Sequence, residues 1–223
     1  MALSDKIIEF YRNLTPERSI PQGFEWLFPY KETETLSCVD QFYRKYFNDY
    51  NPRTILLGIN PGRFGAGVTG ISFTDPKILK DKCGIDNDFP KKNELSAVFV
   101  YEFIEAFGGI EAFYQKFFIS SVCPLGFTRN GINCNYYDDK DLYQSVKPFI
   151  VDSLRQQLEL GINRNIAFSL GKGTNYKYLQ YLNDEFQFFK EIKPLPHPRW
   201  VMQYRRKDKE VHIQNIIKQL QVI

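Results

Sequence analysis

The stretch ILLGINPGRFGAGVTGISFTDP, residues 55–76, decides how the rest of this chain is arranged. Its first five residues, Ile55 to Ile59, are all apolar, which is typical of a short strand buried on both faces of a parallel sheet. The strand then breaks into a loop with four glycines and two prolines. Asn60 therefore stands at the carboxyl end of a buried strand, where open α/β sheets bind their ligands. Pro61 and Gly62 fix the exit of the chain and let backbone N–H groups approach a ligand closely. We interpret this loop as the floor of a pocket.

Strand-like and helix-like segments alternate along the rest of the chain. Three more apolar runs predict strands, at 117–122, 165–170 and 186–192, and helical spacing of apolar residues recurs at 4–11, 32–47, 94–107, 141–160, 174–182 and 211–220. This alternation predicts an α/β fold: a three-layer α/β/α sandwich with a central four-stranded, mainly parallel sheet. We expect one domain, with a helical part at 1–50 and an α/β core at 51–223.

Three further segments lack a clear period. Residues 21–30 are aromatic and rich in turn formers, residues 75–92 are charged and irregular, and residues 128–138 are polar with several asparagines. We expect a turn-rich segment, an irregular connection and a polar loop, respectively.

Composition excludes several classes of protein. The 223 residues carry a formal net charge of only +3, so any site for a polyanion must be a local patch. The four cysteines have neither CxxC nor Cys/His ligand spacing, so we expect no metal and reduced thiols in a cytoplasmic protein. The N-terminus lacks the apolar region of a signal peptide, and no apolar run is long enough to span a bilayer.

The predicted sheet gathers chemistry-bearing residues at one edge. Asn60 follows the first strand, Ser121 ends the second, Lys172 lies in the Gly-Lys-Gly loop after the third, and His197 follows the fourth. No GxxxxGK[ST] loop, GxGxxG fingerprint or GxSxG elbow is present, so phosphate-loop, dinucleotide and α/β-hydrolase readings are weak. Taken alone, Asn60 before Pro-Gly is a common turn former and His197 between two prolines is a common loop histidine.

Three motifs resemble one family. Residues 58–73, GINPGRFGAGVTGISF, look like the first motif of the single-strand-selective monofunctional uracil-DNA glycosylases, GMNPGPFGMAQTGVPF, with the same length from asparagine to final phenylalanine. Residues 118–125, FISSVCPL, are similar to the family's FVHNLCPL segment, and His197-Pro198 matches the start of its second motif. The resemblance covers about residues 55–199.

The resemblance implies a monofunctional DNA glycosylase of base excision repair, which flips a damaged base out of DNA and needs no cofactor. Asn60 would position the attacking water, and His197 would donate a hydrogen bond to the departing base. The family pattern implies base contacts and DNA contacts as well. The expected base-binding residues are Gly62, Arg63, Phe64, Gly65, Phe73 and Ser121, and the expected DNA-binding residues are Arg199, Arg205, Arg206, Lys207 and Lys172. Arg199 would be the wedge that holds the gap, and Phe73 would stack on the flipped base.

The chain departs from the family at the base-reading position. Ser121 stands where the family has an asparagine, so uracil, 5-hydroxymethyluracil, xanthine and hypoxanthine all stay open as lesions. We expect a monomer that acts on single- or double-stranded DNA. Two alternatives are a mismatch-specific uracil/thymine-DNA glycosylase, against which His197 argues, and a noncatalytic module that binds damaged DNA or nucleotides.

Overall fold

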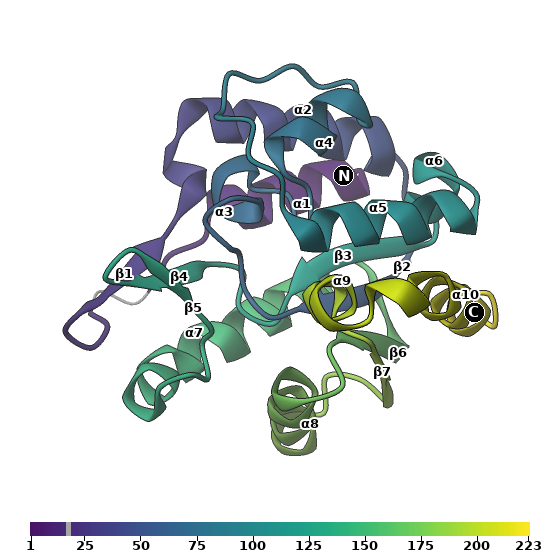
Figure 1. Cartoon of the computed structure of the whole chain (residues 1–223). Coiled ribbons are helices and arrows are strands. Elements are labelled where there is room, and N and C mark those ends of the chain that lie inside the picture. Colours follow the sequence, from purple (N-terminus) through teal and green to yellow (C-terminus); the bar gives the residue numbers. More distant parts are fainter. Residues whose placement is uncertain (17–18) are drawn as a thin grey trace.

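A four-stranded parallel sheet forms the centre of the molecule (Figure 1). The computed structural model describes residues 1–16 and 19–223. The strands are β2 (Arg53–Gly58), β3 (Phe117–Ser121), β6 (Ile162–Leu170) and β7 (Glu191–Leu195), in the order β3-β2-β6-β7, and each neighbouring pair is parallel. The carboxyl ends of the strands therefore meet at one edge, where Gly58 pairs with Ser121 and Leu170 with Leu195.

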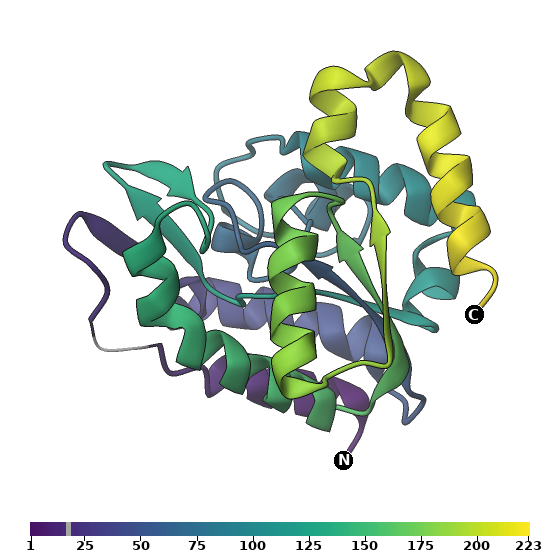
Figure 2. The same ribbon diagram turned by 90° about the horizontal axis from the view of Figure 1, so that it is seen from below.

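Helices cover both faces of this sheet (Figures 1 and 2). On one face α5 (Leu95–Phe107) packs against α9 (Pro198–Tyr204) and α10 (Lys209–Leu220). On the other face α7 (Lys140–Glu159) and α8 (Thr174–Phe186) pack against β6. The predicted α/β fold with helices on both sides of a four-stranded parallel sheet is confirmed.

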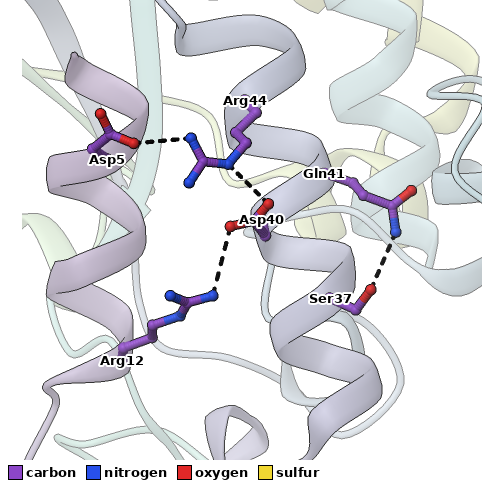
Figure 3. A network of polar contacts seen from close by, with 6 residues as sticks. All are labelled: Asp5, Arg12, Ser37, Asp40, Gln41 and Arg44. Carbon is purple, nitrogen blue, oxygen red and sulfur yellow. Dashed lines mark hydrogen bonds and ion pairs between the residues drawn. The ribbon is translucent and has the colours of Figure 1, made fainter.

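The two N-terminal helices are joined to the sheet and to each other. Aromatic rings of α2 (Thr33–Phe47) pack on Phe118 of β3, through Tyr43 at 6.2 Å and Phe47 at 5.9 Å between ring centroids. Figure 3 shows the polar contacts that tie α2 to α1 (Leu3–Arg12). There Arg44 of α2 lies 2.9 Å from Asp5 of α1. Such exposed pairs contribute little free energy, so the buried aromatic rings hold this part in place.

A second, smaller sheet was not expected from the sequence. It is antiparallel, in the order β1-β4-β5, and consists of β1 (Phe24–Leu27), β4 (Gly126–Arg129) and β5 (Ile132–Cys134). The predictions of a turn-rich segment at 21–30 and of a polar loop at 128–138 are therefore wrong, because each segment contains strand residues. Strands of three or four residues leave little periodicity in a sequence.

Other boundaries also differ from the prediction. The fourth strand begins at Glu191 rather than 186, because α8 continues through Phe186 and ends at Gln187, whose φ is +53°. The segment at 75–92 contains α4 (Pro76–Asp81), which begins after the capping side chain of Asp75. The remaining short elements are η1 (Pro29–Lys31), α3 (Ala66–Thr69), α6 (Ile110–Tyr114) and η2 (Arg206–Asp208). Among the described helices, none has the length and apolar character needed to cross a membrane.

Candidate active site

Asn60 lies two residues beyond β2 and is held by the backbone of β5 and of the segment that follows β5. Its Nδ2 donates to the carbonyl oxygen of Cys134 at 3.1 Å and lies 3.4 Å from that of Pro61. Its Oδ1 accepts a hydrogen bond from the backbone N–H of Tyr136 at 3.1 Å. A carbonyl oxygen has two lone pairs, so one side of Oδ1 stays open for a further donor.

The Tyr136 side chain extends this support into the core. It is fully buried, and its hydroxyl donates to Oδ1 of Asn175 at 3.0 Å. The Asn175 amide lies 3.4 Å from both the carbonyl oxygen of Gly58 and the hydroxyl of Ser169. The end of β2, the end of β6 and the segment after β5 are therefore linked by one buried polar network.

The glycine loop folds back on itself after Asn60. Backbone N–H groups of Gly65 and Gly67 donate to the carbonyl oxygen of Gly62, at 3.2 and 2.9 Å. Further along, the Thr69 hydroxyl donates to the carbonyl oxygen of Thr74 at 2.6 Å. This fold of the loop requires glycine at position 67, because a Cβ there would lie 2.7 Å from the Gly62 carbonyl oxygen.

Phe73 closes the loop against the end of β2. A Cβ on Gly58 would lie 2.8 Å from Cε2 of the Phe73 ring, so only glycine lets the ring lie this close. Phe73 itself has a φ of +52°, which is unusual for a bulky residue and costs free energy. Backbone strain of this kind is concentrated at ligand-binding sites.

His197 lies two residues beyond β7 and caps α9. Its Nδ1 accepts from the backbone N–H of Arg199 at 3.2 Å, so a neutral ring carries its proton on Nε2. Burial, together with the nearby Arg199 charge, lowers the pKa of His197 to about 4. His197 is therefore neutral at pH 7 and presents an N–H donor.

One pocket of about 120 Å³ brings several predicted residues together. Its lining includes Asn60, Gly62, Phe73, Ser121, His197 and Arg199. Ser121 is buried at the end of β3, and its carbonyl oxygen lies 3.4 Å from Nε2 of Gln157. Among the described residues, none forms a hydrogen bond with the Ser121 hydroxyl, and Ser121 lines a pocket that holds both donors and acceptors.

The other predicted residues lie outside this lining. Gly65 is a buried residue of the glycine loop. Arg63 and Phe64 are on the surface, where the Arg63 guanidinium contacts the Phe64 ring and the Gly131 carbonyl oxygen. The predicted DNA contacts beyond Arg199 are also exposed. Lys172 follows β6 beside a neighbouring pocket that shares Ile59 and His197, and Arg205, Arg206 and Lys207 follow α9.

Two sets of lining residues were missed by the sequence analysis. Asn133, Cys134 and Asn135 belong to the β5 segment, and their polar character was the available signal. Glu94 was interpreted only as the start of a helix, and it is the one carboxylate among the lining residues described. Burial, opposed in part by Arg199 and reinforced by Asp75, raises the pKa of Glu94 to about 7. Neutral and ionised Glu94 are therefore both present near pH 7.

Comparisons with known proteins agree with the resemblance found in the motifs. A family model described as the uracil DNA glycosylase superfamily matches residues 44–221. Two curated relatives are named single-strand selective monofunctional uracil-DNA glycosylase: the Rattus norvegicus protein is 29% identical and the Mus musculus protein 28% identical, each over 105 residues. Each match spans 38% of this chain and only 38% of the relative. A crystal structure described as wild-type Pedobacter heparinus SMUG2 is 46% identical, with a TM-score of 0.96, and covers 100% of this chain and 98% of that one.

Proposed function

Because the chain belongs to the uracil DNA glycosylase superfamily, we propose that it is a monofunctional DNA glycosylase. It hydrolyses the N-glycosidic bond of a deaminated or oxidised base in DNA, as a step of base excision repair. Uracil is the first expected lesion, and Ser121 leaves 5-hydroxymethyluracil, xanthine and hypoxanthine open. The observation that carries this proposal is the meeting of Asn60, Phe73 and His197 in one pocket.

The chemistry of the reaction fits these side chains. Breaking the bond between C1′ and the base builds positive charge on the sugar and negative charge on the leaving base. The neutral His197 offers Nε2–H to the base oxygen on which that charge develops, a contribution of about 10²–10³ in rate. Asn60 offers the open side of Oδ1 to a water molecule that attacks C1′.

The pocket also suits an extruded base. The Phe73 ring lies against Gly58 at the pocket wall, where it can stack on a planar base. The described lining holds no lysine amine that could form a Schiff base with the sugar, so we expect no lyase step. Arg199 at the rim is the candidate wedge, and the exposed cations beyond it are candidates for phosphate contacts.

An alkali-cleavage assay tests the proposal. Labelled single- and double-stranded oligonucleotides with uracil, 5-hydroxymethyluracil, xanthine or hypoxanthine are incubated with the wild type, Asn60→Ala and His197→Ala. We expect abasic sites with the wild type and a loss of about 10² or more with each variant. Asn215→Ala, at an exposed position on α10, is the matched control for Asn60. DNA binding without release of any base would contradict the proposal and favour a noncatalytic binding module.

A further inference from the structure

Glu94 lines the pocket, although its place just before a helix predicts a capping residue. It directly precedes α5, where a side chain usually caps the helix, but the Glu94 side chain makes no capping hydrogen bond. Its backbone N–H is instead fixed by Oδ2 of Asp75 at 2.9 Å, and its side chain extends into the pocket wall. No hydrogen bond or ion pair to its carboxylate occurs within residues 1–16 and 19–223.

The glycine loop is shaped around this carboxylate. A Cβ on Gly65 would lie 1.7 Å from Oε2 of Glu94, and a Cβ on Gly62 would lie 3.8 Å from Oε1. The carboxylate thus lies on the turn that directly follows Asn60. Gly62 and Gly65 have no side chains, and the Glu94 carboxylate fills the space that they leave.

Asn60 gives an attacking water molecule no strong proton acceptor. Its amide is neutral, and its Nδ2 is already used on backbone carbonyl oxygens, so it can orient a water but cannot take a proton from it. A group in the same pocket that takes this proton works best with a pKa near the working pH. The lining offers His197, whose Nδ1 is occupied by Arg199 N–H, and Glu94, whose oxygens are free.

We propose that Glu94 is the general base of this site, which takes a proton from the water that Asn60 orients as the water oxygen bonds to C1′. The electron pair of the breaking C1′–N bond leaves with the base, which His197 stabilises as an anion. Glu94 ends protonated and releases that proton to solvent or to the departed base, so the net reaction is hydrolysis by one water. This inference rests on the proposed glycosylase function.

The charges around Glu94 agree with such a role. Burial and the Asp75 carboxylate raise its pKa to about 7, while Arg199 on α9 opposes the rise. The other titratable groups in the lining are His197, with a pKa of about 4, and Cys134, whose pKa is raised above its ordinary value of 9.0. Neither titrates between pH 5.5 and 8.5, so a pH effect in this range reports on Glu94. The side chains of Arg63 and Lys92 lie on the Phe64 ring, outside the lining.

Single-turnover release of uracil from a single-stranded oligonucleotide, measured from pH 5.5 to 8.5, tests the proposal. The wild-type rate is expected to rise about tenfold for each pH unit below 7 and then level off. Glu94→Gln is expected to have a flat profile and to be about 10² slower at pH 8, with rates within a few fold of the wild type at pH 5.5. Glu105→Gln, on the exposed face of the same helix, is the matched control.

Gly65→Ala provides a second variant that leaves Glu94 itself unchanged. The added methyl displaces the flexible end of the Glu94 side chain, so the rate of the Gly65→Ala variant should also become independent of pH. Thermal melting and binding of the uracil oligonucleotide show that each variant is folded. A Glu94→Gln profile that still rises with pH, with a rate within threefold of the wild type, would overturn the proposal. A changed order of lesions with an unchanged pH profile would also overturn it and assign Glu94 to base reading. A wild type that releases no base would overturn the proposed function and this inference together.

Discussion

The backbone of Cys134 and Tyr136, more than 70 residues later in the chain, holds both ends of the Asn60 side-chain amide. Nδ2 donates to the Cys134 carbonyl oxygen at 3.1 Å, and Oδ1 accepts from the Tyr136 N–H at the same distance. An amide has both the donor and the acceptor that these two partners require, whereas a carboxylate has acceptors alone. The short strand β5 therefore sets the orientation of Asn60.

We predict that Asn60→Asp is impaired in both stability and activity. The carboxylate has no hydrogen for the Cys134 carbonyl oxygen, so two acceptors face each other at about the same distance. The expected cost is about 1–3 kcal/mol in the free energy of unfolding and about 10² in the single-turnover rate. Thermal melting and uracil release measure the two effects, with Asn215→Asp as the surface control. Wild-type values for both would show that the amide contacts are unimportant.

We predict that His197 acts as a neutral donor at every pH near neutrality. His197→Ala should reduce the rate by about 10²–10³, and the ratio of wild-type to variant rate should be the same at pH 6 and pH 8. The reason is that burial and Arg199 keep the pKa of His197 at about 4. His212→Ala, at the other histidine of the chain, is the matched control. A ratio that grows as the pH falls from 8 to 6 would instead indicate a cationic imidazole.

The core of the fold could be predicted because its signals are local. The apolar run before Asn60 and the glycine loop predict β2 and its turn, and strand alternation predicts that the ends of parallel strands meet. Asn60 and His197 consequently do line one pocket. The strand at 186–192 was misplaced because buried Phe188 and Phe189 sit in a loop, where their apolar character imitates a strand.

The supporting parts of the site could not be predicted because they depend on contacts between distant segments. Cys134 reaches Asn60 only after β5 pairs with β4, and three residues of strand give no recognisable period. Glu94 resembles any acidic residue at the start of a helix. Asp75 holds the Glu94 backbone in place, and Gly65 leaves room for its carboxylate in the pocket.

We predict that Ser121 broadens the range of lesions. Ser121→Asn should raise the ratio of uracil to xanthine release by about tenfold, because an amide has fixed donor and acceptor faces where a hydroxyl can rotate. Ser121→Ala removes the hydroxyl and should change the same ratio. Ser120→Ala is the control, since the Ser120 hydroxyl lies 3.4 Å from Tyr11, away from the pocket. Rates measured on each oligonucleotide give the ranking, and an order unaffected at position 121 would contradict the prediction.

We predict that Glu94→Gln stabilises the protein at alkaline pH. The folded state raises the pKa of Glu94 from 4.5 to about 7, so it binds a proton more tightly than the unfolded chain. This contribution to stability is fully present below pH 4.5 and is lost as the pH rises through 7. Glutamine has no such loss, so the variant should be more stable than the wild type by roughly 1–3 kcal/mol at pH 8 and by little at pH 4.5. Thermal melting of both proteins at the two pH values measures this difference, which does not depend on activity. A constant difference would show that Glu94 has an ordinary pKa.

We predict that the exposed cations after α9 bind DNA phosphates. Arg205, Arg206 and Lys207 follow the helix that His197 begins. Arg205 lies over the ring of Trp200, which lines a pocket together with His197. Binding of single-stranded DNA releases counterions, and the slope of log affinity against log salt is about −0.7 for each phosphate contact.

Replacing all three cations by glutamine should therefore make the slope shallower by up to about 2, with a loss of affinity that is greatest at low salt. The lesion ranking should stay the same, because phosphate contacts carry no information about the base. Arg155→Gln, on α7 across the sheet, controls for the loss of a surface charge. Fluorescence anisotropy with a labelled oligonucleotide from 50 to about 300 mM salt gives the slopes. An unchanged slope for the triple variant would place the DNA on another surface, with the exposed Lys172 as the next cation to test.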